Sequence, residues 1–368
     1  MSPSYAHITG WGMAVPDKIL TNHDLAKMVD TSDEWIVSRT GIHERRIARA
    51  DQSTASLAAE AGLRALQVAN LHPGELDMII VSTSSPEYIF PATACLVQDR
   101  IGAGKASAFD LLAACTGFVY AINLGAQAIK SSAVKNVLVI GSETLSRLVN
   151  WKDRNTCILF GDGAGAFVIQ ASEEPGGVLS AVLRSDGSGG DLLSVPGGGS
   201  RHPASMQSLY DGLHYIQMNG REVFRFATRV MVEATQQTIE SANLTMDDIQ
   251  LVIPHQANQR IIEAAARGLD YPMDKVMVNL DRFGNTSTAS IPIATVEAIE
   301  QNRLKPGDNV VMVAFGSGLT WGATLIQWSG PLPYRRKVSP RKVQWFARTR
   351  SLLARLRRRI EGILWGRE

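Results

Sequence analysis

The stretch A-N-L-H-P-G-E-L-D-M-I-I-V, residues 69–81, recurs as A-N-L-T-M-D-D-I-Q-L-V-I from residue 242, which lies 173 positions further along the chain. A second pair of segments keeps the same offset, because N-V-L-V-I begins at Asn136 and N-V-V-M-V begins at Asn309. Two independent matches at one offset indicate an internal duplication. The fold is therefore expected to contain two similar halves.

Each copy shows the same order of hydrophobic patterns. An amphipathic helix, 56–68 or 232–241, is followed by a turn and a short apolar strand, 78–81 or 251–253. A further strand–helix unit and a strand rich in Val and Ile come next. Strands that alternate with helices form mostly parallel sheets covered by helices, so we predict an α/β fold.

The stretch D-L-L-A-A-C-T-G-F-V-Y-A-I-N-L-G-A-Q-A-I-K, residues 110–130, has nineteen uncharged residues between its terminal charges. That length would just cross a bilayer as a helix. The matching region of the second copy, however, carries Asp281, Arg282 and Glu297. A helix buried between two packed halves needs no polar face. We therefore interpret the stretch as a strand that leads into a core helix.

Cys115 falls at the predicted strand-to-helix turn of this stretch. The free N–H groups and the dipole at a helix N-terminus favour a thiolate, which is the nucleophilic form of cysteine. Taken alone, a free cysteine is as well explained as a small buried residue. Cys95 and Cys157 are interpreted as structural, and the spacing of the three cysteines predicts neither a disulfide framework nor a zinc site.

The second copy supplies polar residues at matching places. His255 follows the apolar strand 251–253, where α/β sheets bind ligands at their carboxyl ends. Asn285 lies three residues before the position equivalent to Cys115. Each alone would be read as a structural residue, but the duplication predicts that both face Cys115.

Five motifs together resemble the thiolase-fold condensing enzymes, specifically β-ketoacyl-[acyl-carrier-protein] synthase III. They are D-E-W-I-V-S-R-T-G-I from residue 33, A-C-T-G-F from 114, P-H-Q-A-N-Q-R from 254, G-N-T-S from 284 and F-G-S-G-L-T-W-G from 315. The resemblance covers about residues 8–328. It implies a five-layered α-β-α-β-α fold, a homodimer and a catalytic set of Cys115, His255 and Asn285. The implied substrates are an acyl-CoA primer and malonyl-acyl carrier protein, with no cofactor.

The resemblance implies separate chemical roles for Cys115, His255 and Asn285. Cys115 takes the acyl group as a thioester, and His255 and Asn285 donate hydrogen bonds to the enolate of decarboxylated malonyl-acyl carrier protein, without a general-base carboxylate. Backbone N–H groups of Cys115 and Ser317 form the oxyanion hole. Ser317 and Thr116 depart from the Gly and Ala expected in the family, which leaves the shape of the acyl pocket open.

The resemblance also assigns substrate-binding residues. An indole and guanidinium groups are suited to hold adenine and phosphate of CoA. The assigned residues are Trp35, Arg39, Arg154 and Asn258 for CoA and pantetheine, Arg260 for the acidic carrier protein, and Phe90 for the acyl pocket of a partner subunit.

Two other functions stay open at this stage. A ketosynthase or acyltransferase of specialised metabolism would use the same three residues with a different primer or acceptor. A non-catalytic acyl-binding scaffold is disfavoured by the intact Cys-His-Asn set. G-D-G-A-G-A from Gly161 is followed by a strand pattern rather than a helix, so it predicts a tight turn instead of a dinucleotide site.

Charge separates the body from the C-terminal end. The whole chain of 368 residues has a net charge of +2, but residues 334–368 contain twelve Lys and Arg against two Glu. We expect a first half over 1–172, a second half over 173–333, and a basic amphipathic helix over 334–368. That helix suits an anionic membrane surface, although packing on the acidic body, solvation, or docking of the carrier protein are alternatives. No secretory signal is seen, so the expected location is the cytoplasm.

Overall fold

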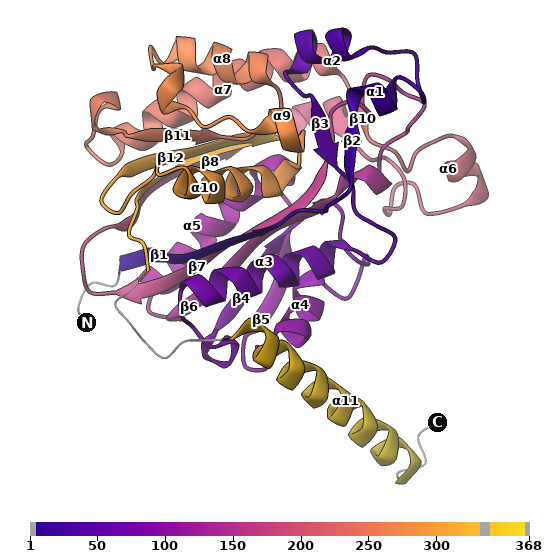
Figure 1. Ribbon diagram of the computed structural model, residues 1–368, viewed down its shortest axis with the longest axis vertical. Coiled ribbons are helices and arrows are strands. Elements are labelled where there is room, and N and C mark those ends of the chain that lie inside the picture. The colour runs from indigo at the N-terminus through magenta and orange to yellow at the C-terminus, as the bar shows by residue number, and fades with distance from the viewer. Residues whose placement is uncertain (1–4, 332–338, 365–368) are drawn as a thin grey trace.

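The computed structural model describes residues 5–331 and 339–364 and contains two main β-sheets (Figure 1). The first has the strand order β1-β7-β6-β4-β5, and its strands are β1 (Tyr5–Ala14), β4 (Met78–Ser82), β5 (Ser107–Leu111), β6 (Asn136–Thr144) and β7 (Asp162–Ser172). The second has the order β8-β13-β12-β11, and its strands are β8 (Gly177–Ser185), β11 (Leu251–Pro254), β12 (Asn309–Gly316) and β13 (Thr320–Gln327).

The two sheets repeat one topology. β4 runs parallel to β5 and β6, as β11 runs parallel to β12, and the remaining neighbours in both sheets are antiparallel. Both β4 with β11 and β6 with β12 start 173 positions apart. The duplication inferred from the sequence is thus present in the structure.

Helices form three layers around the two sheets (Figure 1). α3 (Thr54–Val68) and α4 (Thr93–Ile101) cover the first sheet, and α7 (Gly220–Glu240) and α8 (Gln259–Gly268) cover the second. α5 (Gly117–Lys130) and α10 (Ser290–Glu300) lie between the sheets. The five layers α-β-α-β-α confirm the predicted fold class.

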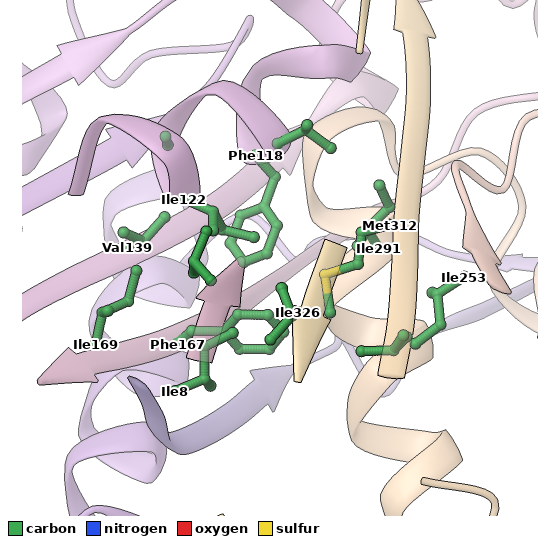
Figure 2. Packing of buried hydrophobic residues seen from close by; sticks show 14 of the residues in the cluster. Ile8, Phe118, Ile122, Val139, Phe167, Ile169, Ile253, Ile291, Met312 and Ile326 are labelled. Atoms are coloured by element: carbon green, nitrogen blue, oxygen red, sulfur yellow. The ribbon is translucent and has the colours of Figure 1, made fainter. Parts of the chain in front are cut away.

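The central layer explains the uncharged stretch 110–130. Figure 2 shows Phe118 and Ile122 of α5 packed beside Phe167 of β7, with Ile291 and Met312 of the second half close by. Phe118 and Phe167 are fully buried and their rings meet edge to face, with centroids 5.0 Å apart. The stretch is a core helix because both sheets cover it. None of the described helices has the length and apolarity that crossing a membrane requires.

Shorter elements surround this core. Four short strands form two pairs, β2 (Ile19–Thr21) with β3 (Glu44–Arg46) and β9 (Leu193–Ser194) with β10 (Gln217–Met218). The short α-helices are α1 (Asn22–Leu25), α2 (Asp33–Thr40), α6 (Met206–Tyr210) and α9 (Leu280–Phe283). The 3-10 turns are η1 (Pro73–Glu75), η2 (Ala114–Thr116), η3 (Leu145–Arg147), η4 (Gly187–Leu192), η5 (Met246–Asp248), η6 (Met273–Lys275) and η7 (Ser287–Ala289).

The tight turn predicted for G-D-G-A-G-A is wrong, because β7 already begins at Asp162. The glycines serve close packing between the halves. A Cβ atom on Gly165 would lie 2.6 Å from Cβ of Pro292 in α10, and one on Gly163 would lie 2.9 Å from Ile293. The glycine-rich pattern therefore marks where α10 approaches the backbone of β7.

The basic C-terminal stretch contains α11 (Pro340–Leu364), which projects from the body near α4 (Figure 1). Its first described turns are docked, since Val343 and Ala347 are buried and Ser351 donates a 2.8 Å hydrogen bond to Asp99 of α4. Side chains at 352–360 are exposed. Residues 334–338 and 365–368 of the predicted tail lie outside the described residues.

Candidate active site

Cys115 lies in η2, between the end of β5 and the start of α5. The residue before it, Ala114, has a positive φ of 45°, which makes the sharp turn from strand to helix. Gly316, the last residue of β12, closes the turn from the second half, because a Cβ atom there would lie 2.8 Å from the backbone nitrogen of Cys115. The strand that leads into this turn, β5, ends at Leu111.

The Cys115 thiol is held in its neutral form. Only 7% of the residue surface is exposed, and burial raises the pKa of the thiol to about 12. The thiolate that the helix N-terminus favours in the sequence pattern is therefore not the resting form. Loss of hydration outweighs the short-range helix dipole at this position.

His255 follows β11 at the carboxyl end of the second sheet. Its backbone N–H donates to the carbonyl oxygen of Val313 in β12, and its ring meets Phe315 edge to face at 5.4 Å. Nδ1 of the ring lies 2.7 Å from Oγ of Ser290. Complete burial lowers the pKa of the imidazole to about 3, so His255 is neutral at physiological pH.

Asn285 is fixed by the segment that precedes β7. Its backbone N–H donates to Leu159 and its carbonyl oxygen accepts from Gly161, at 2.8 and 3.0 Å. Its side-chain Oδ1 accepts a 2.8 Å hydrogen bond from the N–H of Ser287. This bond orients the amide and leaves the two N–H groups of Nδ2 as the donors of Asn285.

Residues 285–290 connect the three predicted catalytic residues. The backbone N–H of Ser287 binds Oδ1 of Asn285, and Oγ of Ser290 lies at hydrogen-bond distance from Nδ1 of His255. η2 packs against η7 and against the end of β12. The structure therefore gathers Cys115, His255 and Asn285 around one short segment of the second half.

The two departures from the family pattern have local hydrogen-bond partners. The hydroxyl of Ser317, just after β12, donates to the carbonyl oxygen of Leu193 in β9. Oγ1 of Thr116 lies 3.0 Å from Oγ1 of Thr320 in β13. Both side chains thus engage neighbouring strands.

Three of the predicted CoA-binding residues form one stack at the surface. The guanidinium carbons of Arg39 and Arg154 lie 4.6 and 5.2 Å from the ring centre of Trp35. Arg154 also pairs with Asp30 at 3.2 Å. Asn258 joins this group, since its Nδ2 donates a 2.9 Å hydrogen bond to the carbonyl oxygen of Arg39.

The side chains of Arg260 and Phe90 have other surroundings. Oδ1 of Asn258 accepts the N–H of Arg260 and so begins α8, and the exposed Arg260 side chain lies 5.9 Å from the ring centre of Phe224. Phe90 is 84% exposed in a loop between β4 and α4, with Ile89 equally exposed beside it. Phe90 therefore does not contribute to the core of its own chain.

Sequence reasoning missed Glu143 and the two serines that bind the catalytic residues. Glu143 is completely buried and interacts electrostatically with Cys115. The available signal was an acidic residue at the carboxyl end of the apolar strand N-V-L-V-I-G-S-E. Among the described residues, no group of three or more acidic, His or Cys side chains is placed to hold a metal ion.

A duplicated five-layered fold, with a buried cysteine at a strand-to-helix turn that packs against η7 of the second half, defines a thiolase-fold condensing enzyme. A family model for 3-oxoacyl-[acyl-carrier-protein (ACP)] synthase III matches residues 109–187, and the model of its C-terminal part matches 239–328. The chain belongs to the β-ketoacyl-[acyl-carrier-protein] synthase III family, whose members are acyltransferases.

Individual relatives show how far the similarity extends. The β-ketoacyl-[acyl-carrier-protein] synthase III of Roseiflexus sp. (strain RS-1) is 53% identical over 326 residues, which cover 89% of this chain and 99% of the relative. That of Desulfitobacterium hafniense (strain DSM 10664 / DCB-2) is 56% identical over 322 residues, 88% of this chain and 97% of the relative. The crystal structure of the Aquifex aeolicus VF5 synthase superposes with a TM-score of 0.81 at 48% identity, covering 88% of this chain and all of that one.

Proposed function

We propose that the chain starts fatty acid biosynthesis by condensing an acyl-CoA primer with malonyl-acyl carrier protein, with loss of CO2. Membership of the family supports the reaction, and the site supports the roles of the residues. The observation that carries this assignment is the packing of η2, which holds Cys115, against η7, whose segment 285–290 contains Asn285 and binds His255.

In the first half-reaction, Cys115 attacks the acyl-CoA thioester and CoA leaves as its thiol. The product is a new thioester of similar energy on Cys115, which stores the acyl group for the second step. The tetrahedral intermediate carries an oxyanion, for which we assign the backbone N–H groups of Cys115 and Ser317 as donors. Gly316 supports this assignment because it brings the end of β12 against Cys115.

In the second half-reaction, malonyl-acyl carrier protein loses CO2 and its enolate attacks the acyl group on Cys115. Ser290 accepts from the N–H of Gln256 at 3.3 Å, and its own hydroxyl proton is assigned to Nδ1 of His255. The single N–H of the neutral imidazole is then on Nε2. This N–H and the Nδ2 amide of Asn285 are the two donors that stabilise the enolate oxygen.

CoA is assigned to the stack on Trp35. The guanidinium groups of Arg39 and Arg154 already cover the flat surface of the indole. Adenine would move one guanidinium away from the indole and bind between the two groups. Asn258 follows His255 by three residues and donates to the carbonyl oxygen of Arg39 in the stack, which supports its role along the pantetheine arm. The exposed Arg260 is suited to the acidic carrier protein.

A homodimer is proposed through the edge of the first sheet. β5 is an edge strand in the described chain. Leu112, which follows it, is 75% exposed, and Ile89 and Phe90 are each 84% exposed. A second copy would cover these apolar side chains and pair the strand edge. Phe90 would then lie against the acyl site of the partner subunit.

The exposed part of α11 is proposed to contact an anionic membrane surface. The docked residues Val343, Ala347 and Ser351 define one side of the helix. An apolar stripe at helical spacing lies on the other side and is exposed; it consists of Trp345, Phe346, Leu352, Leu353, Leu356 and Ile360. A bilayer boundary can take up such a stripe, whereas the protein body is on the opposite side.

Charge makes the membrane surface the best match among the alternatives for α11. Four exposed arginines flank the apolar stripe, namely Arg348, Arg355, Arg357 and Arg359. Each basic residue near anionic lipid contributes about 1 kcal/mol. α11 also lies outside the residues that the two family models match, which end at residue 328.

The function is tested with a panel of acyl-CoA primers of increasing chain length. The enzyme is mixed with each primer and malonyl-acyl carrier protein, and the β-ketoacyl product is measured by mass spectrometry. Product that depends on both substrates supports the proposal and its chain-length profile identifies the primer. No product with any primer, together with no acyl adduct on Cys115, would overturn it.

A further inference from the structure

The hydroxyl of Thr320, the first residue of β13, binds both loops that meet beside the nucleophile. Its Oγ1 lies 3.1 Å from the carbonyl oxygen of Ala113, the residue before η2, and 3.0 Å from the carbonyl oxygen of Ser317, the residue after β12. A carbonyl oxygen only accepts, so the single proton of the hydroxyl is shared between the two carbonyls. One side chain of the second half thus joins the loop of Cys115 to the loop of Ser317.

Thr116 orients the hydroxyl of Thr320 from the side of η2. Its Oγ1 lies 3.0 Å from Oγ1 of Thr320 and 3.2 Å from the carbonyl oxygen of that residue. Because Thr320 gives its proton to the carbonyls, Thr116 is the donor between the two hydroxyls. Thr116 is completely buried, and its backbone N–H donates to Ala113 at 3.1 Å. The hydroxyl of Thr320 therefore has three hydrogen-bond partners in fixed positions.

The two N–H groups that we assign to the oxyanion lie close along the chain to these carbonyls. The hydrogen bond from Thr116 to Ala113 opens η2, so the N–H of Cys115 precedes it and is among the free N–H groups at the start of a helix. The N–H of Ser317 and the carbonyl that Thr320 binds belong to one residue. Peptide planes are rigid and turn only about φ and ψ, so fixing the two carbonyls restricts both N–H groups.

Other hydrogen bonds hold the loop 317–319 to a different part of the chain. The hydroxyl of Ser317 donates to the carbonyl oxygen of Leu193. The N–H of Leu319 donates to Asp186 at 2.7 Å, and its carbonyl oxygen accepts from Asp186 at 2.8 Å. These bonds tie the loop to the segment 186–193, whereas the hydroxyl of Thr320 ties it to the loop of Cys115.

We propose that Thr320 is a positioning residue for the oxyanion hole, and that its hydroxyl sets the distance and direction of the N–H groups of Cys115 and Ser317 relative to each other. Both groups have to reach one thioester oxygen when it becomes an oxyanion, and donors act there only at hydrogen-bond distance. Donors that are held in place beforehand need no rearrangement during the reaction. Thr320 acts through the backbone in this role and exchanges no proton. The inference rests on the proposed function, because it concerns the acylation and condensation steps of that reaction.

A purely structural role for Thr320 predicts a different pattern of defects. The enolate donors are assigned to His255, after β11, and to Asn285, before η7, which are other elements than the loops that Thr320 joins. Loss of the oxyanion geometry should therefore slow acylation and leave decarboxylation of malonyl-acyl carrier protein intact. A general loosening of the site would slow both steps together. The two half-reactions thus distinguish positioning from packing.

The test compares Thr320→Val and Thr320→Ser with the wild type in single-turnover acylation by an accepted acyl-CoA primer, without malonyl-acyl carrier protein. Thr320→Val keeps the branched shape and removes the hydroxyl, so its maximal acylation rate should fall by about 10-fold to 10²-fold. The acyl-CoA concentration at half of the maximal rate should not change, because CoA is assigned to the stack on Trp35. Thr320→Ser keeps the hydroxyl and should restore the wild-type rate. If Thr320→Val does not fold, the smaller Thr320→Ala takes its place with the same expected result.

Thr324→Val is the matched control on the same strand. Thr324 belongs to β13 and is completely buried, and its hydroxyl has no hydrogen-bond partner within the part of the chain that the structure describes. The same replacement at this position should leave acylation, condensation and decarboxylation unchanged. If Thr324→Val acylates as slowly as Thr320→Val, the loss comes from the packing of β13 and the proposal is overturned.

Three further results would overturn the positioning role and leave the proposed function intact. Thr320→Val acylates as fast as the wild type, or Thr320→Ser is as slow as Thr320→Val, or Thr320→Val loses decarboxylation by the same factor as acylation. Decarboxylation is measured as CO2 released from malonyl-acyl carrier protein, and its persistence also shows that a variant is folded. If the wild type itself forms no acyl adduct with any primer, the proposed function fails instead.

Discussion

Ala114 and Ser287 occupy equivalent places in the two copies of the repeat, 173 positions apart, and both have a left-handed backbone with φ of 45° and 48°. Each begins a 3-10 turn, η2 or η7, that leads into a central helix, α5 or α10. A non-glycine residue in this region costs energy that the surrounding packing must offset. The two copies thus keep one strained turn, which carries the nucleophile Cys115 in the first half and binds the side chain of Asn285 in the second.

Replacing Cys115 by alanine separates the two half-reactions. We expect Cys115→Ala to form no covalent adduct with acyl-CoA, since no other nucleophile is assigned. Because the enolate donors are on His255 and Asn285, this variant should still decarboxylate malonyl-acyl carrier protein. Intact-protein mass spectrometry and CO2 release measure the two steps, and full condensation activity in the variant would refute the role of Cys115.

Asn285→Asp tests the enolate donor without removing the local structure. Aspartate can still accept the N–H of Ser287 through a side-chain oxygen, as Asn285 does at 2.8 Å, but it has lost the Nδ2 donors. The variant should acylate normally and condense ~10²–10³-fold more slowly. His255→Ala should likewise acylate normally and condense more slowly. Equal loss of acylation and condensation in Asn285→Asp would contradict it.

His255 should stay neutral across the physiological pH range. Burial lowers the pKa of its imidazole to about 3, so its ring signals in an NMR pH titration should not shift between about pH 5 and about pH 8. Comparison with His255→Gln identifies those signals among the seven histidines. A depressed pKa also means that the folded state loses stability as the pH falls from about 6.5 toward 3. A titration midpoint near 6.5 would refute the neutral donor.

Trp35→Ala tests the binding of CoA. Loss of the indole removes the surface on which Arg39 and Arg154 lie, and a stacking contribution of about 1 kcal/mol corresponds to about a fivefold rise in KM for acyl-CoA. KM for malonyl-acyl carrier protein should not change. A primer carried on pantetheine alone is the control, because without adenine the difference between the variant and the wild type should disappear.

The apolar stripe of α11 predicts binding to vesicles. The full chain should co-sediment with vesicles containing anionic phospholipid, less so at high salt, and a chain ending at Pro333 should not. The double variant Leu353→Glu/Leu356→Glu, at two exposed positions, should lose binding while keeping condensing activity. Equal sedimentation of the full and shortened chains would remove the membrane role. Lost activity in the shortened chain would make α11 part of the enzyme body.

The sequence predicted the parts of the fold and site that depend on repetition. The offset between Asn136 and Asn309 indicated two matching halves, and the position of Asn285 relative to Cys115 indicated a shared site. The position of Ser287 near the site could not be predicted, because it arises when η7 of one half packs against β6 and η2 of the other. The glycines 161–165 were misread since a pattern of glycine does not distinguish a turn from a close approach of two elements.

The burial of Cys115 also has a consequence for damage by oxidants. Peroxides convert thiolates, not neutral thiols, to sulfenic acid, and they need access to the sulfur. Only 7% of the surface of Cys115 is exposed, and burial raises the pKa of its thiol to about 12. Between catalytic cycles Cys115 therefore offers peroxides neither a thiolate nor access to its sulfur. The enzyme should therefore survive oxidative conditions that inactivate proteins with an exposed, ionised nucleophile. Oxidation of Cys115 should be confined to turnover.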